Sequence, residues 1–235
     1  LLFLFNSWAQ LEVDTSFLRE VVFELSDVEY EGRLTGSIGE KKAANFIANA
    51  LKSSNIHPFQ NDYHHSFDFQ YTFKNNGTLR TNHLTGENVI GWIDNQIDKT
   101  ILLAAHYDHL GKNQLGGERS QESEFPIYFG ADDNASGVAV LLSIAEEVSR
   151  SQEHFDANFL IAFFSGEEQG LQGSKAFAKL LESTNIEVHS MLNFDMLGRL
   201  STDRKLFIDG VGTGNTLDSL LEMNNAKFEF SMIKN

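Results

Sequence analysis

Cysteine is absent from the 235 residues of this chain. Disulfide bonds, thiolate catalysis and cysteine-ligated zinc sites are therefore excluded, and any metal ion must be held by histidine, aspartate and glutamate. Proline is scarce, with two residues, and the sequence has no Pro/Gly/Ser-rich linker, internal repeat or low-complexity run. It thus shows no internal domain boundary and predicts one large domain.

Basic residues are also few, with 18 Lys and Arg against 33 Asp and Glu and a formal net charge of -15. Such an acidic surface argues against nucleic acid or an anionic membrane as a partner. Beyond the first residues, no stretch is long and apolar enough to span a membrane. The hydrophobic content of 41% is enough for a sizeable core. No pattern in the sequence indicates an oligomeric state.

The first nine residues have the composition of a secretory leader. Leu1 to Phe5 are apolar, and Ser7 and Ala9 are small residues at the two positions that a signal peptidase reads. We therefore predict that residues 1–9 are the remnant of a signal peptide, cleaved after Ala9, and that the protein is secreted or periplasmic. The alternative is a short buried strand or helix.

The remainder, residues 10–235, is predicted to be one α/β domain. Asp14 or Ser16 can begin a helix, and Ser37 precedes a second one. Residues 66–73 alternate between aromatic and polar, as in a strand with one solvent-exposed face. Strands and helices then alternate, which predicts a mostly parallel central sheet with helices on both faces, in three layers. The expected strands cover residues 88–93, 100–105, 158–164, 188–194 and 205–208.

Polar residues follow the apolar strands of this predicted sheet. Ligands bind beyond the carboxyl ends of the strands in such folds, so the side chains that follow different strands should meet at one edge. A pair of aspartates also stands just before a predicted helix, where the loop after a strand would place it. The residues brought together in this way are His106, Asp108, Asp132, Asp133, Glu167, Glu168 and Asp195.

Histidine and carboxylate ligands without sulfur suit zinc, manganese or cobalt. His106 can bind a metal through one ring nitrogen while Asp108 receives the proton on the other. One of Glu167 and Glu168 can bind metal while its neighbour acts as general base on metal-bound water. The alternative is that these are solvated loop acids and acids favoured at a helix start.

Four motifs, HYDHLG, GADDNASG, FSGEEQGLQGS and NFDMLGR, occur in this order. Together with GRLTGS near the start, they resemble metallopeptidase family 28, the co-catalytic zinc aminopeptidases, many of them secreted by bacteria. The resemblance covers roughly residues 14–200. It implies the fold of zinc-dependent exopeptidases, similar to the phosphorylase/hydrolase fold, a bacterial source, and residues 10–235 as a zinc peptidase catalytic domain.

The resemblance also implies a role for each motif residue. His106 and Asp195 would bind one zinc, Glu168 the second, and Asp132 would bridge the two ions. Glu167 would be the general base. Asp108 would orient His106, and the peptide bond between Asp132 and Asp133 would be cis.

The reaction implied by the resemblance is hydrolysis of an N-terminal peptide bond, so the expected substrates are the N-termini of peptides or proteins. A water or hydroxide shared by two zinc ions would attack the carbonyl, and Glu167 would pass its proton to the leaving amine. The pattern does not indicate which N-terminal residue is preferred.

The sequence departs from the family at one ligand, a histidine that completes the second metal site near the family's C-terminus. None of the eight histidines follows Asp195. We therefore expect a domain truncated at its C-terminal end that binds one zinc well and the second poorly. Two alternatives are a single-zinc glutaminyl-peptide cyclotransferase and a non-catalytic, receptor-like domain of the same fold. A carboxypeptidase or dipeptidase preference also stays open.

Overall fold

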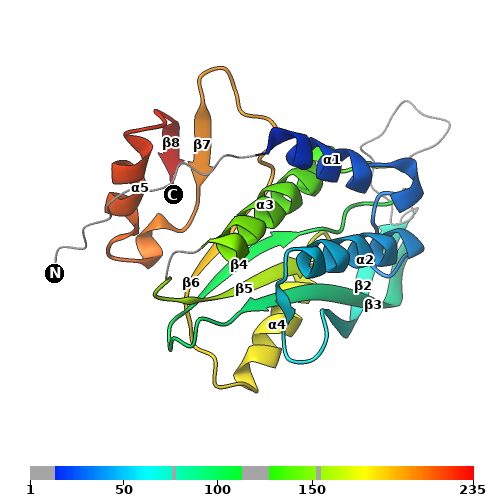
Figure 1. Cartoon of the computed structure of the whole chain (residues 1–235). Helices are drawn as coiled ribbons and strands as arrows, with labels where there is room; N and C mark the ends of the chain where they lie inside the picture. The colour runs from blue at the N-terminus through cyan, green and yellow to red at the C-terminus, as the bar shows by residue number, and fades with distance from the viewer. Residues whose placement is uncertain (1–13, 76–77, 113–126, 152–154) are drawn as a thin grey trace. The chain divides into compact units, whose positions relative to one another are not determined.

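The computed structural model describes residues 14–75, 78–112, 127–151 and 155–235 (Figure 1). Contacts divide the chain into two compact units, Leu1–Met196 and Leu197–Asn235, whereas the sequence showed no boundary near Met196. Every residue predicted for the metal site belongs to the first unit. The predicted leader, residues 1–9, lies outside the described residues, so it stays a prediction.

The described residues of the first unit form one sheet of six strands. Its strand order is β1-β3-β5-β4-β6, and β2 pairs with β3 as a long hairpin. The pairs β4–β5 and β4–β6 are parallel, whereas β1, β2 and β5 pair antiparallel with β3. The strands are β1 (His57–Pro58), β2 (His64–Asn75), β3 (Thr78–Ile93), β4 (Thr100–His106), β5 (Asn158–Phe164) and β6 (Val188–Asn193).

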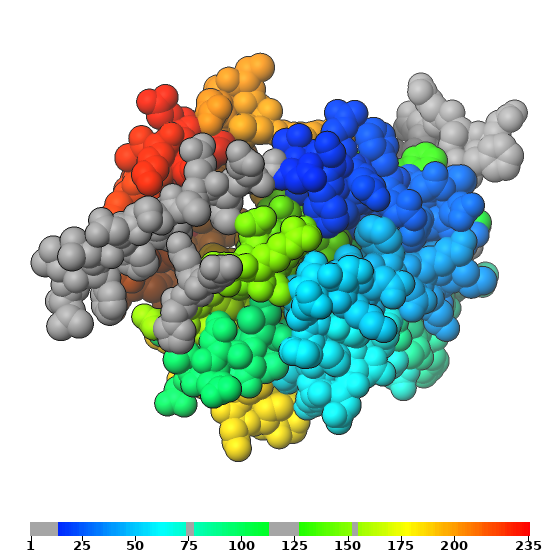
Figure 2. Space-filling model, in the orientation of Figure 1, coloured from blue at the N-terminus to red at the C-terminus, as the bar shows by residue number. Residues whose placement is uncertain are grey.

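Helices cover both faces of this sheet, so the predicted three-layer α/β fold is confirmed, with a mixed sheet whose parallel part is β5-β4-β6. Helices α1, α2 and α3 lie on one face and α4 lies on the other (Figure 1). Figure 2 shows α1, in dark blue, next to α2, in lighter blue. The bounds are α1 (Thr15–Leu25), η1 (Val28–Tyr30), α2 (Ile38–Ser53), η2 (Ala131–Ser136), α3 (Gly137–Arg150) and α4 (Gln172–Glu182).

Strand β5 lies at the centre of the core and is buried along its whole length. Phe159, Ile161 and Phe163 pack in the cluster under α1, α2 and α3. Leu160, Ala162 and Phe164 point the other way, into the cluster under α4. This alternation follows from the two-residue period of a strand, and it explains why a strand with two covered faces is apolar throughout.

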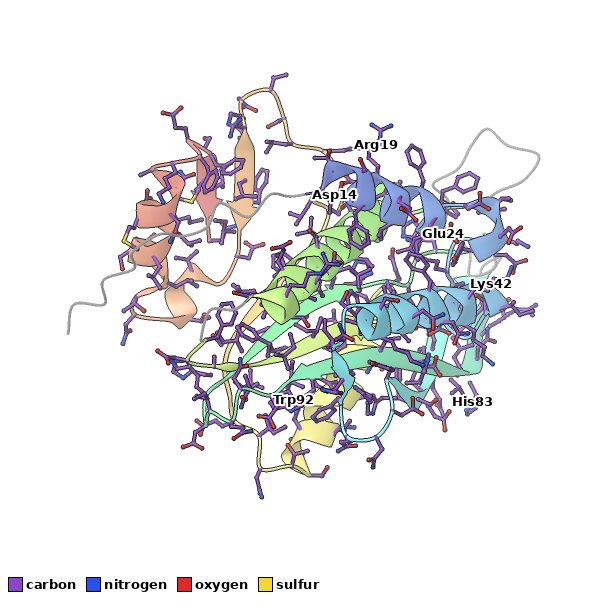
Figure 3. The ribbon with its side chains drawn as sticks, viewed as in Figure 1. Asp14, Arg19, Glu24, Lys42, His83 and Trp92 are labelled. Carbon is purple, nitrogen blue, oxygen red and sulfur yellow. The ribbon has the colours of Figure 1, made fainter. Side chains whose placement is uncertain are left out.

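The predicted helix starts are confirmed by their caps. Asp14, labelled at the start of α1 in Figure 3, accepts a hydrogen bond from the backbone N–H of Ser16 at 2.8 Å. Ser37 accepts one from the backbone N–H of Glu40 at 3.1 Å. Both caps satisfy amide groups that a helix leaves without a partner in its first turn. None of the helices among the described residues is long and apolar enough to cross a membrane.

The second unit is small and contains a parallel strand pair with a helix between the strands. Its elements are β7 (Lys205–Ile208), η3 (Val211–Thr213), α5 (Leu217–Asn225) and β8 (Ser231–Lys234). Leu206 lies opposite Met232 in the β7–β8 pair. The expected strand at 205–208 is thereby confirmed.

Candidate metal centre

The carboxyl ends of three parallel neighbours, β5, β4 and β6, form the candidate site. His106 is the last residue of β4 and pairs in register with Phe164 at the end of β5. On the other side, Ala104 pairs with Asn193 at the end of β6. Glu167, Glu168 and Asp195 follow these strand ends within four residues. The predicted convergence at one sheet edge is confirmed.

His106 is buried, and its two ring nitrogens face different partners. Nδ1 lies 3.2 Å from the backbone carbonyl oxygen of Asp108, which can only accept, so Nδ1 carries a proton. Nε2 lies 3.2 Å from Asp133 Oδ1 and 3.5 Å from Asp195 Oδ1. In a neutral ring Nε2 would be an acceptor that faces two further acceptors. A cation at this point, either a proton or a metal ion, resolves the conflict.

The electrostatics of His106 show how strongly this place favours positive charge. Burial alone would lower the pKa of His106, but the carboxylates of Asp108, Asp133 and Asp195 outweigh it and raise the pKa to about 12. The hydrogen bond with His106 in turn lowers the pKa of Asp133. Zinc takes nitrogen and carboxylate oxygen ligands, so the group of His106, Asp133 and Asp195, called the His106 group below, fits a zinc ion.

A second group of candidate ligands stands beside the first. His109 Nδ1 lies 2.8 Å from Glu168 Oε1 and 3.9 Å from Asp133 Oδ2. In each group the three ligand atoms lie within 4.8 Å of one another. Asp133 belongs to both groups, one carboxylate oxygen facing each histidine. The second group, His109, Asp133 and Glu168, is called the His109 group below, and its donor set also suits zinc.

Asp133 stands between the two histidines, whereas Asp132, the predicted shared ligand, is in neither group. Within η2, Asp133 leaves helical geometry, with φ -102° and ψ 97°. Successive side chains of extended backbone point to opposite sides. The cis peptide bond joins Asp133 to Asn134, so the expectation of a cis bond between Asp132 and Asp133 is wrong by one position.

Asn134 is fully buried and joins the three segments that carry the ligands. Its amide nitrogen donates to the backbone carbonyls of His106 at 3.2 Å and Phe194 at 2.9 Å. Its amide oxygen accepts from the backbone N–H groups of Gly137 at 3.0 Å and Met196 at 3.1 Å. The bond to Gly137 lies at the first residue of α3. Sequence reasoning did not predict the links of Asn134 to the ends of β4 and β6.

Asp108 has a wider role than the predicted orientation of His106. Its carboxylate Oδ1 is 3.6 Å from His106 Nδ1. The same carboxylate accepts the backbone N–H groups of Glu167 at 3.1 Å and Glu168 at 3.3 Å. The hydroxyl of Thr35 donates to it at 3.2 Å. Asp108 therefore fixes the turn that presents both glutamates, in addition to lying behind His106.

Glu167 lines a cavity beside the His106 group and is not a member of either ligand group. Burial raises the pKa of Glu167, and the negative charges of Asp108, Glu168 and Asp195 act in the same direction while His106 opposes them. The cavity has a volume of about 250 Å³ and is lined by His106, Phe164, Ser165, Glu167, Leu171, Ser174, Met191, Asn193 and Asp195. A carboxylate with a raised pKa beside a cavity is suited to proton transfer.

A known protein family and curated proteins are similar to this chain in sequence. The sequence model of peptidase family M28 matches residues 88–234. A probable zinc metalloprotease of Pyrenophora tritici-repentis is 34% identical over 106 residues, which are 45% of this chain and 20% of that protein. A probable leucine aminopeptidase of Trichophyton verrucosum is 30% identical over 143 residues, 59% of this chain and 36% of that protein. The chain thus spans well under half the length of these two relatives.

Solved structures share the fold. The zinc aminopeptidase BSAP from Bacillus subtilis superposes with a TM-score of 0.72 at 16% identity, over 96% of this chain and 80% of that one. A glutaminyl cyclase from Porphyromonas gingivalis superposes with a TM-score of 0.65 at 17% identity, over 94% and 74% of the two chains. At such identities the likeness concerns the fold, which both kinds of enzyme share.

Proposed function

The chain belongs to peptidase family M28, and on this premise we propose that it is a zinc-dependent aminopeptidase, a hydrolase that releases N-terminal amino acids from peptides or proteins. The observation that carries the proposal is the position of the Asp133 carboxylate between His106 and His109, with Asp195 and Glu168 on either side. The relatives described as zinc metalloprotease and leucine aminopeptidase support the same reaction class.

In this proposal the His106 group and the His109 group would each hold a zinc ion, and Asp133 would be a ligand common to both groups. This replaces Asp132 in the predicted set and retains His106, Glu168 and Asp195. Bound zinc polarises a peptide carbonyl and makes water more acidic. His109 is a further addition to the predicted ligand set, and it supplies the second group with a nitrogen donor.

Glu167 is the proposed general base. Its side chain lines the cavity together with His106 and Asp195, so it faces the place where a substrate carbonyl would meet the metal ligands. It takes a proton from the attacking water and gives one to the leaving amine, which leaves the glutamate unchanged at the end of the reaction. The apolar wall of Phe164, Leu171 and Met191 suits an uncharged substrate side chain.

The proposal is tested by the full chain loaded with zinc and by its Glu167→Gln variant. We expect release of the N-terminal residue from short peptides by the loaded protein, its loss on chelation, and a rate about 10²–10⁴-fold lower in the variant. The variant should still bind zinc, because Glu167 is outside both groups. A variant that turns over like the unchanged protein would remove Glu167 as the base.

A glutaminyl-peptide cyclotransferase is the second candidate, and the fold shared with the Porphyromonas gingivalis enzyme supports it. A peptide that begins with glutamine separates the two reactions. A peptidase releases free glutamine and shortens the chain, whereas a cyclotransferase releases ammonia and leaves a pyroglutamyl peptide of unchanged length. Mass spectrometry of the products decides between them. If neither product forms in the zinc-loaded protein, the receptor-like alternative is favoured.

Secretion and a bacterial source stay predictions. They rest on the apolar residues 1–5, on the small residues Ser7 and Ala9, and on the family resemblance. The similar proteins reported above come from Pyrenophora and Trichophyton as well as from Bacillus and Porphyromonas. Expression of residues 1–235 behind an initiator methionine, with N-terminal sequencing of protein from the periplasm or medium, tests cleavage after Ala9.

A further inference from the structure

The largest of the fully buried side chains in the described part of the chain is an arginine, Arg33, with 0% exposure. It belongs to the motif GRLTGS, for which the proposed chemistry has no use. A cation with no access to water is costly unless its donors are all satisfied and charge of the opposite sign lies close by. The contacts of Arg33 therefore indicate what it does for the molecule.

The guanidinium of Arg33 donates to four backbone carbonyls from three separate segments. Nε bonds the carbonyl of Tyr107 at 2.7 Å, directly beside His106. Nη1 bonds Phe129 at 2.9 Å and Nη2 bonds Gly130 at 2.8 Å, in the stretch that leads into η2. Nη1 also donates to Leu25, the last residue of α1, where the helix end carries partial negative charge.

Two further features show that Arg33 lies next to His109, a member of the His109 group. Its own carbonyl accepts the backbone N–H of His109 at 3.2 Å. Gly130 has a φ of +61°, and a Cβ added there would lie 2.5 Å from Arg33 Nη2 and 2.7 Å from His109 Cδ2. Only a glycine fits between the guanidinium and the imidazole at this backbone conformation.

The charge of Arg33 also lies near the carboxylates of the site. Burial lowers the pKa of Arg33 to about 10, and the negative charges of Asp108, Asp133 and Glu168 oppose that decrease. The side chain therefore stays cationic at neutral pH. Its positive charge offsets part of the repulsion between these acids, while its N–H donors bond backbone carbonyls and not the carboxylates.

We propose that Arg33 is a positioning residue for the two metal groups. Its guanidinium holds the Phe129–Gly130 stretch against the end of β4, and this positions Asp133 between His106 and His109. The inference rests on the proposed metal sites. A lysine would keep the charge, but its ammonium group has only three N–H donors and cannot bond all four carbonyls that surround the planar guanidinium of Arg33. Geometry, and not charge alone, is then what Arg33 supplies.

The test compares Arg33→Lys with Arg19→Lys in the full chain. Arg19, labelled in Figure 3, is exposed on α1 and makes a matched control. Zinc affinity is measured by competition with a chromogenic chelator, and the melting temperature of the metal-free protein is measured beside it. We expect Arg33→Lys to weaken zinc binding about 10–100-fold in a protein that still melts cooperatively, and Arg19→Lys to change nothing.

Unchanged zinc affinity in a folded Arg33→Lys variant would overturn the inference. An equal loss of zinc affinity in the exposed control, Arg19→Lys, would also overturn it, because the effect would then not depend on the contacts of Arg33. If the unchanged protein binds no zinc, the proposed function fails instead. Should Arg33→Lys not fold, Gly130→Ala decides, because it displaces the fork and keeps the charge: weakened zinc binding supports the positioning role, and unchanged binding contradicts it.

Discussion

The two metal groups share Asp133 but differ in how their histidines are held. His106 has Asp108 behind Nδ1 and presents Nε2 to Asp133 and Asp195. His109 instead points Nδ1 itself at Glu168, at 2.8 Å. The Nδ1 atom of His106 is held by Asp108, and this orients Nε2 towards the other ligands, whereas in His109 the nitrogen that bonds Glu168 is the one that would bind the metal. A pre-oriented ligand set binds metal more tightly, so we expect the His106 group to be the tighter site.

The largest effect should come from the shared ligand. Asp133→Asn should abolish binding at both groups and lower the hydrolysis rate by at least about 10³-fold, because the chemistry supplied by both ions is lost. Asp132→Asn is the matched control and should bind zinc as the unchanged protein does. Metal analysis after dialysis, together with a peptide hydrolysis assay, measures both. If Asp132→Asn lost zinc binding and activity while Asp133→Asn kept them, Asp132 would be restored as the bridging ligand.

The histidines separate the two groups. His106→Gln should remove the tighter of two zinc-binding steps, with affinity lower by roughly 100-fold, because a pre-oriented nitrogen ligand is lost. His109→Gln should remove only the weaker step. Calorimetric titration of zinc into each variant resolves the steps. Equal losses in both variants would contradict the difference between the groups, and an unaltered titration of His109→Gln would remove His109 from the ligand set.

Asp108 supports both groups, so its variant should affect them together. In Asp108→Asn, the amide keeps one oxygen that accepts from the turn, but its NH₂ faces the backbone N–H donor of either Glu167 or Glu168. We expect hydrolysis to fall about 10–100-fold, the range typical for partners behind metal ligands. Zinc should still bind at both steps. A loss confined to one step would show that Asp108 serves one group alone.

Much of this arrangement could be predicted from the sequence. The strand of residues 158–164 was predicted with the bounds that the structure gives β5, since an apolar run between polar residues marks a strand covered on both faces. The convergence of His106, Glu168 and Asp195 followed from one rule about the ends of parallel strands. Local pattern and a topological rule were sufficient there.

The remainder depended on contacts between distant segments. Asp132 and Asp133 have the same chemistry, and only the extended backbone at Asp133 decides which one faces the histidines. Arg33 bonds residues that are 74 and 97 positions away, and no spacing in the sequence indicates such pairs. His109 was not predicted as a ligand, because its partner, Glu168, lies 59 residues further along the chain.

The smallest expected effect concerns Thr35, a buried residue that bonds Asp108. Its hydroxyl donates to Asp108 and accepts the backbone N–H of Gly166 at 3.1 Å. Thr35→Val keeps the shape and leaves these buried partners unsatisfied, which should cost about 1–3 kcal/mol of unfolding free energy. Denaturant titration of the metal-free protein measures this. Both zinc-binding steps should weaken to the same degree, and a shift in only one would contradict a shared support.

Anomalous diffraction at the zinc edge, on crystals of the full chain soaked with zinc, tests the shared-ligand arrangement most directly. The account predicts two peaks on either side of the Asp133 carboxylate, one bound by His106 and Asp195 and the other by His109 and Glu168. At limiting zinc the peak at His106 should fill first. A peak bound by Asp132, or two ions that do not share Asp133, would contradict it.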